Sequence, residues 1–285
     1  MNPINNSIED SDVLPEGFVD LHTHLVPGVD DGARSPEDSA VMLQQARESG
    51  TVVVAATPHV YPGVMDWNSL EAMLQARDQW VERANREFSQ ISVVPGAEVH
   101  CTHAVLEALN RFDRRLTLNG GDYFLLEFPF EVLFPRLEEL IFQLQRGGWI
   151  PIIAHPERNQ VIQRSPGVLF RLVLAGVLVQ INTGSLDGQF GEDARRSAWQ
   201  LLANNLVHVV ASDAHWPRER PPDMSTAESI LMEHQLGDPD RLLRRNPANI
   251  LSNQGIERMA EPLDPAVRSG GIISRLRQHF QGRES

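Results

Sequence analysis

The run Phe18-Val19-Asp20-Leu21-His22-Thr23-His24 carries the pattern on which the expected fold depends. It is short, largely apolar, and closes on two histidines with one residue between them. Such a run is typical of a strand that is covered on both faces, as in a parallel sheet. The pattern recurs along the chain. Seven strands are predicted, at residues 18–22, 51–56, 91–94, 123–127, 149–154, 178–182 and 207–212.

Amphipathic segments separate these strands. Helices are predicted at residues 36–48, 68–88, 134–146, 166–174 and 192–204. The first is the best marked, because Ser35 is a typical N-cap and Pro36 suits the first turn. Glu37 and Asp38 follow beside the positive end of the helix dipole, and Gly50 lies where a left-handed C-cap would end the helix.

Alternating strands and helices predict a parallel α/β sheet, and closure into a barrel is the economical arrangement. An open, doubly wound sheet is the alternative, although no glycine-rich phosphate loop follows the first strand. We expect residues 1–16 to form an N-terminal arm and residues 17–255 the barrel. Residues 256–285 are expected to form a basic C-terminal appendage, with an amphipathic stretch at 272–280 after Gly270-Gly271.

The composition limits the classes of function. A formal charge of -13 over 285 residues argues against nucleic-acid binding, which needs clustered Lys and Arg. The single cysteine, Cys101, excludes an internal disulfide and fits a reducing compartment. Neither a signal peptide nor a membrane span is expected, so the sequence predicts a cytoplasmic protein. The oligomeric state stays open.

Side chains that bind metals follow most of the predicted strands. They are His22, His24, His59, Glu98, His155, Asp213 and His215. Because parallel strands all end on one face, we expect these side chains to converge at the barrel mouth. Residues i and i+2 of a strand point the same way, so each H-x-H or D-x-H pair can reach one ion. Imidazole and carboxylate ligands suit Zn, Mn or Fe.

A structural role is the alternative for each histidine taken alone, as a hydrogen-bonded polar group at a strand end. His208 precedes a strand and is interpreted as structural, and His234 and His279 as solvent-facing and inert. His100 and His103 lie near Glu98, where solvated positions are favoured over ligation. The whole constellation favours a metal site, because buried polar groups are costly unless they are partnered.

Four further residues are candidates for the same mouth. In the turn after the first strand, either Asp30 or Asp31 is a plausible ligand, and the other a proton carrier. Arg158 and Arg220 follow the fifth and seventh strands, where a planar guanidinium could hold phosphate oxygens. If three divalent ions bind, their charge exceeds that of the nearby carboxylates and would attract an anionic substrate. No G-x-S-x-G elbow or cysteine-based phosphate loop is present.

The motifs together resemble the polymerase and histidinol phosphatase (PHP) superfamily. They are His22-x-His24, Asp31-Gly32, Thr57-Pro58-His59, Gly96-Ala97-Glu98, His155-Pro156-Glu157-Arg158 and Ser212-Asp213-x-His215. Within it, the chain is most similar to the bacterial manganese-dependent protein-tyrosine phosphatases of capsule and exopolysaccharide systems. Further motifs of that branch are Leu126-Glu127-Phe128, Gln180-Ile181-Asn182, Arg220-Pro221-Pro222-x-Met224 and Asn246-Pro247-x-x-Ile250. The resemblance covers about residues 18–251.

This resemblance implies a distorted (β/α)7 barrel that binds three divalent ions. Mn is the first candidate for these ions, and Fe, Co and Zn are the alternatives. The implied ligands are His22, His24, Asp31, His59, Glu98, His155, Asp213 and His215. Arg158 and Arg220 would hold the substrate phosphate, and Asp30 or His100 could act as a general acid. The implied substrate is the phosphorylated, tyrosine-rich tail of a membrane tyrosine autokinase that controls polysaccharide export.

The mechanism expected from these residues is direct hydrolysis by water that the ions make acidic, without a covalent enzyme intermediate. Two other functions remain as alternatives. One is a small-molecule phosphatase on the same barrel, such as a histidinol-phosphate phosphatase. The other is a catalytically silent, metal-bound docking module for a membrane kinase.

Overall fold

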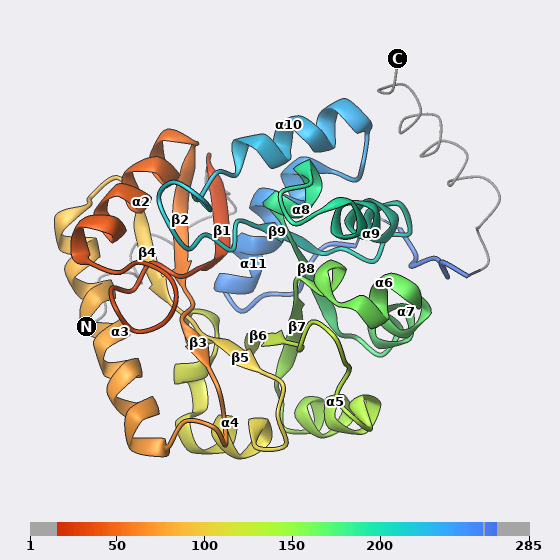
Figure 1. The fold of residues 1–285 in the computed structure, drawn as a ribbon, viewed down its shortest axis with the longest axis horizontal. Coiled ribbons are helices and arrows are strands. Elements are labelled where there is room, and N and C mark those ends of the chain that lie inside the picture. The colour runs from red at the N-terminus through yellow and green to blue at the C-terminus, as the bar shows by residue number, and fades with distance from the viewer. Residues whose placement is uncertain (1–15, 259, 267–285) are drawn as a thin grey trace.

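A computed structural model of the chain describes residues 16–258 and 260–266 (Figure 1). The predicted N-terminal arm therefore lies outside the described residues except for Glu16, and so do Gly270-Gly271 and the amphipathic stretch after them. Residues 256–258 and 260–266, which the prediction assigned to the appendage, are described. Among these, the backbone N–H of Leu263 donates to the Asn204 carbonyl. The domain boundary at 255 stays a prediction.

All strand pairs in the described part of the chain are parallel, as predicted. The strands are β1 (Phe18–Thr23), β2 (Thr51–Ala56), β3 (His59–Val60), β4 (Ser92–Pro95), β5 (Glu98–His100), β6 (Tyr123–Glu127), β7 (Ile150–Ala154), β8 (Leu178–Asn182) and β9 (Val209–Ala211). The seven predicted strands are all present, with small shifts at their ends. Strands β3 and β5 are additional.

The strands form two sheets and not the single sheet that was expected. The first sheet has the order β1-β2-β4, and the second has the order β3-β5-β6-β7-β8-β9. Pro58 stands between β2 and β3, where it cannot donate a ladder hydrogen bond. Gly96 and Ala97 similarly separate β4 from β5. Each additional strand therefore continues the path of the strand before it into the second sheet.

The two sheets are joined at both borders. At one border the chain itself runs from β2 into β3 and from β4 into β5, and Gly96 N donates to Ala56 O at 2.9 Å beside these breaks. At the other border, Asp213 N donates to His22 O at 2.9 Å, and His24 N donates to Ala214 O at 2.8 Å. The architecture is thus mixed α/β, with parallel strands whose carboxyl ends meet.

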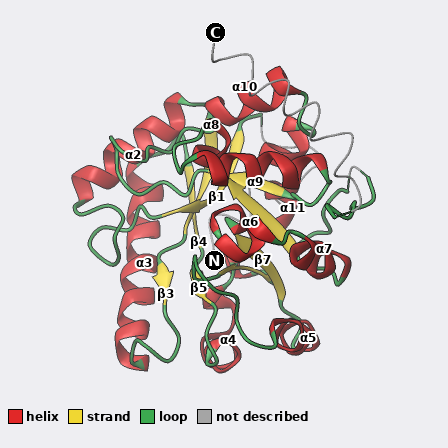
Figure 2. Ribbon diagram, turned by 45° about the vertical axis from the view of Figure 1, so that its right-hand side comes forward, coloured by secondary structure: helices red, strands yellow, loops and turns green. Residues whose placement is uncertain are grey.

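Helices surround the strands (Figures 1 and 2). They are α2 (Pro36–Glu48), α3 (Trp67–Glu87), α4 (Val105–Phe112), α5 (Leu137–Arg146), α6 (Gln160–Arg164), α7 (Gly167–Leu174), α8 (Thr183–Asp187), α9 (Glu192–Ala203), α10 (Ser225–His234) and α11 (Asn246–Leu251). Helix α2 has the predicted bounds, and Ser35 caps it by accepting from Asp38 N. Gly50, two residues after the end of this helix, has a φ of +92°, as a left-handed cap requires.

The core lies between the strands and these helices. Every residue of β1, β6 and β8 is buried, as expected for strands covered on both faces. Along the described ranges, no helix combines the length and the apolar character that a membrane span requires.

Candidate metal centre

The structure brings together all eight side chains that the sequence proposed as metal ligands. His22 lies near the end of strand β1, and His24 lies just beyond that end. His59 and Glu98 open the additional strands β3 and β5, so the breaks in the sheets aim these two side chains at the site. The others follow β7 and β9, or lie in the turn after β1. They are His155, Asp213, His215 and Asp31.

Glu98 lies at the centre of the cluster and is fully buried. Its Oε2 atom is 3.1 Å from Nε2 of His22 and 3.3 Å from Nε2 of His24. The same oxygen is 3.0 Å from Nδ1 of His59, while Oε1 is 2.8 Å from Nε2 of His155. One carboxylate therefore contacts four imidazole rings.

Two other carboxylates extend the cluster. Oδ1 of Asp213 lies 3.5 Å from Nε2 of both His22 and His24. Oδ1 of Asp31 lies 3.4 Å from Nε2 of His59 and equally far from Nε2 of His215. The Asp31 side chain is 62% exposed, whereas those of Glu98 and Asp213 are buried. Asp31 therefore marks the open edge of the cluster.

These spacings fit bound divalent ions. Ligand atoms about 2.0–2.2 Å from an ion lie about 3.0–3.6 Å from one another, close to the separations observed here. Oε2 of Glu98 and Nδ1 of His59 are buried without a hydrogen-bond partner, which an ion would supply. Among the described residues, four overlapping groups could each hold an ion: His24/Asp31/His59/His215, His22/Glu98/His155, His22/His24/Asp213 and His59/Glu98/Glu127.

Glu127 is a candidate ligand that the sequence reasoning missed. It is the last residue of β6, and its Oε2 lies 3.5 Å from Nδ1 of His59. The same oxygen is 3.1 Å from Nδ1 of His100, so His100 contacts the cluster through this glutamate. The sequence does contain the feature that would have identified it, because Glu127 is the last residue of a predicted strand, and the other candidates also lie at strand ends.

The cluster attracts positive charge. Burial disfavours the charged form of His24, but hydrogen bonds to carboxylates, that of Asp213 first, raise the pKa of this imidazole well above its usual value. Burial also disfavours the charged form of His59, yet the carboxylates of Glu127 and Glu98 raise the pKa of this imidazole to about 10. The surplus of carboxylates favours cations at this position.

Amide side chains orient the metal-binding groups from behind. Oε1 of Gln180 lies 3.0 Å from Nδ1 of His22, and its Nε2 donates to Oδ1 of Asn182. Nδ2 of Asn182 in turn donates to Oδ2 of Asp213 at 2.6 Å. Such outer contacts set the tautomer and the direction of a ligand, and sequence reasoning had assigned these two amides no role in the site.

Asp30 lies behind His24, away from the open edge. Its Oδ2 is 2.8 Å from Nδ1 of His24 and accepts from the backbone N–H of His59. Burial alone would raise its pKa, but the bond to His24 outweighs burial and lowers it. This position favours a role in orienting His24 over the proton transfer that was predicted.

Arg158 and Arg220 both contact the carboxylate of Asp213. Nη1 of Arg158 lies 3.3 Å from Oδ2 of Asp213, and Nη2 of Arg220 lies 2.5 Å from the same oxygen. Both side chains are about one-fifth exposed or less, at 20% and 17%. Each guanidinium keeps further N–H groups for an anion that enters from solvent.

Backbone conformation marks two of these positions. His155 and Asp213 have φ values of +33° and +53°, in the left-handed region that non-glycine residues seldom adopt. Strained residues of this kind concentrate at functional sites, where the surrounding structure holds them in place.

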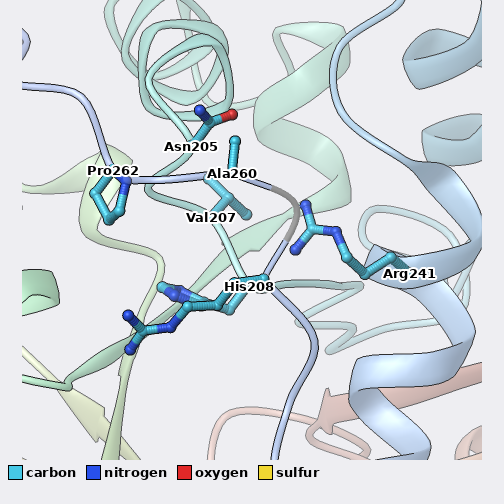
Figure 3. A pocket seen from close by; sticks show the side chains of 7 residues that line it. Asn205, Val207, His208, Arg241, Ala260 and Pro262 are labelled. Carbon is cyan, nitrogen blue, oxygen red and sulfur yellow. The ribbon is translucent and has the colours of Figure 1, made fainter.

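His208 lies at the other end of the strands, before β9. Its Nδ1 accepts from Val179 N at 3.1 Å, in agreement with the structural role that was predicted. It borders a small cavity of about 10 Å³ (Figure 3). The lining residues are Asn205, Val207, His208, Arg241, Arg258, Ala260 and Pro262. His234 contacts the Trp199 ring and His279 lies outside the described residues.

The fold and the cluster define a class of protein: a parallel α/β protein whose strand ends carry a histidine–carboxylate centre suited to divalent ions. The profile of the family described as "Capsular polysaccharide synthesis, CpsB/CapC" matches residues 18–252. The chain belongs to this family.

Named relatives support the same assignment. The chain is 37% identical to tyrosine-protein phosphatase YwqE of Bacillus subtilis, over 88% of this chain and 97% of that protein. It is 30% identical to tyrosine-protein phosphatase CpsB of Streptococcus pneumoniae, over 83% and 99%. A crystal structure from work on these two metal-dependent tyrosine phosphatases matches with a TM-score of 0.77 and 36% identity, over 86% of this chain and 98% of that one.

Proposed function

We propose that this protein is a metal-dependent protein-tyrosine phosphatase that hydrolyses the phosphate monoester of phosphotyrosine. The observation that carries the proposal is the buried cluster around Glu98, with Arg158 and Arg220 facing the same position. A centre that binds divalent ions beside two guanidinium groups suits phosphoryl transfer, which depends on charge stabilisation and positioning. Membership of the CpsB/CapC family agrees with it.

We infer a distorted (β/α)7 barrel of the PHP type as the finer description of the fold. The hydrogen bonds between the two sheets support it, because β2 with β3, and β4 with β5, each occupy one strand position. The bridge between Thr23 and Ala214 joins the first position to the last. Seven strand positions would then enclose the core.

We further propose that the centre holds three divalent ions, with Mn as the first candidate and Fe, Co or Zn as others. The eight predicted ligands would bind them, with Glu127 as an additional one. The overlap among the four ligand groups supports more than one ion. Mixed imidazole and carboxylate donors suit several of these metals, so the choice of Mn rests on the family resemblance.

The residues of this chain suggest how the reaction proceeds. Divalent ions, when bound, acidify water and withdraw charge from the phosphoryl oxygens. Arg158 and Arg220 orient the phosphate and stabilise the charge that develops on its equatorial oxygens. Tyrosinate leaves readily, with a reference pKa of about 10, so a general acid is helpful but not essential. The His100 side chain is more exposed than that of Asp30 and is the better donor.

The proposed substrate is a phosphotyrosine protein, namely the tyrosine-rich tail of a membrane tyrosine autokinase in capsule or exopolysaccharide synthesis. We place the reaction in the cytoplasm, where such a tail and a chain with one free cysteine, Cys101, would both be found.

Metal analysis of the purified protein, combined with turnover of a phosphotyrosine peptide before and after chelation, tests the proposal. We expect bound divalent metal, turnover that chelation abolishes, and recovery when Mn²⁺ is returned. Faster turnover of histidinol phosphate than of the peptide would favour a small-molecule phosphatase.

A second measurement separates catalysis from docking. The variant His22→Ala should lose turnover even where it remains folded. If metal-loaded protein hydrolyses no aryl phosphate and His22→Ala changes stability alone, the docking module is the correct reading. Hydrolysis in ¹⁸O-labelled water should place the label in phosphate, and a trapped phosphoprotein would exclude direct hydrolysis.

A further inference from the structure

Phe130 is an exposed aromatic side chain beside the metal centre. It lies in the loop between β6 and α5 and is 41% exposed. Its ring centroid is 5.9 Å from that of His155, which contacts Glu98. The Cζ atom of Arg158 lies 4.5 Å from the same centroid. One part of the ring therefore covers the site, and another part faces solvent.

Arg158 contacts two aromatic rings. Phe190 lies on it with a centroid-to-Cζ distance of 4.2 Å, in addition to Phe130. Phe190 also contacts Arg220, at 5.1 Å. Cation–π contacts of this kind stabilise a guanidinium, and they leave its N–H edge free for Asp213 and for an incoming phosphate. Because Phe190 and Asp213 hold Arg158 as well, Phe130 is not needed to position it.

The loop that presents Phe130 is fixed in place. Nδ2 of the buried Asn159 donates to Pro129 O at 2.7 Å and to Val132 O at 3.0 Å. The backbone N–H of Gln160 donates to Phe130 O at 2.7 Å. Hydrogen bonds to the backbone carbonyls of the loop therefore set the exposure of the ring, which is a property of the folded site.

We infer that Phe130 determines specificity for aryl phosphate esters by contacting the ring of the substrate tyrosine. The inference rests on the proposed function. A phosphate on the N–H edge of Arg158 would carry its ester group out of the site past Phe130. Aromatic rings pair favourably in offset or edge-to-face arrangements, and an alkyl ester such as phosphoserine offers no ring for this contact.

Two phosphonates that cannot be hydrolysed provide the test, since they differ only in the ring. Inhibition constants of phenylphosphonate and methylphosphonate are measured on the metal-loaded full-length protein and on Phe130→Ala. We expect the wild type to prefer phenylphosphonate, and Phe130→Ala to lose about five- to tenfold of that preference. Methylphosphonate should bind both proteins equally.

Turnover gives an independent readout. The ring contact exists before and during the reaction, so its loss should raise KM for a phosphotyrosine peptide and leave kcat nearly unchanged. Phe130→Trp should retain the preference for phenylphosphonate. Val132→Ala is the matched control, because Val132 is 55% exposed in the same loop and carries no aromatic ring.

The outcomes separate the two proposals. If the wild type hydrolyses no phosphotyrosine peptide, the proposed function fails. If it does, but Phe130→Ala keeps the full preference for phenylphosphonate, only the role of Phe130 fails. An equal loss of affinity for both phosphonates would also overturn it, because that result would mean that Phe130 merely positions Arg158. Phe190→Leu, by contrast, is expected to weaken both phosphonates together.

Discussion

Glu98 combines full burial with contacts to four histidines, more than any other carboxylate of the cluster makes. Burial raises the pKa of its carboxyl, but His22 and the other imidazoles outweigh burial and hold the pKa well below its usual value. A group in this setting stays ionised at neutral pH and would serve a bound ion as a permanent anionic ligand. Its removal would leave those imidazoles without their shared counter-charge.

Glu98→Gln is therefore expected to lose metal and activity together. The amide keeps the size of the side chain but removes the charge, and even outer-shell changes at metal sites cost about 10–100-fold in affinity or activity. We expect a loss of at least about 100-fold in turnover, measured beside metal content by elemental analysis. Glu107→Gln, on an exposed position of α4, is the control. Full metal content in Glu98→Gln would contradict a ligand role.

The sequence predicted the site better at the strand ends than within the strands. The rule that parallel strands end on one face correctly brought Glu98 and Asp213 together. The same rule would have found Glu127, had the end of β6 been treated like the others. Gln180 was not predictable in this way, because it lies within β8 and its contact with His22 depends on how the strands are arranged.

At the level of elements, the turn after β1 is built against His24. Ala33 N donates to His24 O at 2.9 Å, and Gly32 lies so close that an added Cβ would be 2.0 Å from this oxygen. The same turn carries Asp30 and Asp31. A side chain at position 32 would therefore displace both acidic residues from the histidines that they contact.

Gly32→Ala should lower metal affinity and turnover by about tenfold or more, the scale seen when the supporting contacts of a metal site are lost. Titration of metal into the chelated protein would measure the change. Gly167→Ala is the matched control, because nothing lies closer than 4.0 Å to the added Cβ and the residue begins α7. Wild-type affinity in Gly32→Ala would show that the turn can shift at no cost.

The bounds of helix α2 were easier to predict than the division of the sheet, although α4, α6, α8, α10 and α11 were not predicted. Helix α2 has its predicted bounds because Ser35 and Pro36 act locally. The breaks after β2 and β4 depend on where neighbouring strands donate their hydrogen bonds, which a single strand pattern does not contain. Pro58 and Gly96 were visible in the sequence, but only in the folded sheet do they divide seven strand positions into nine strands among the described residues.

For the whole molecule, the metal centre joins segments from both sheets, so bound ions should stabilise the fold. A ligand at about one hundred times its Kd adds about 2.7 kcal/mol per site. In a chain of this size, that raises Tm by about 5–10 °C. Differential scanning calorimetry with Mn²⁺ and with excess chelator would measure the shift. An unchanged Tm, in protein shown by analysis to bind metal, would contradict a centre that ties the two sheets together.

The end of the molecule opposite the metal centre has its own dependence on pH, through His208. Burial, followed by the charges of Arg258 and Arg241, lowers the pKa of this imidazole to about 3 from an ordinary value of 6.5. Between these values the unfolded chain binds a proton that the folded chain does not. The contribution to stability is therefore complete above pH 6.5 and is lost as the pH falls towards 3.

His208→Asn should remove this dependence, because the Asn side chain can still accept from Val179 N but does not titrate. The free energy of unfolding of the wild type should fall more steeply than that of the variant, by up to about 1.4 kcal/mol for each pH unit in this range. Urea unfolding of both proteins at several pH values would measure it. Protons that displace metal from the candidate ligands affect the wild type and the variant alike. The difference between their two plots of unfolding free energy against pH therefore reports on His208 alone. Parallel slopes would show that His208 is protonated in the folded protein, and that the two arginines do not exclude a third positive charge.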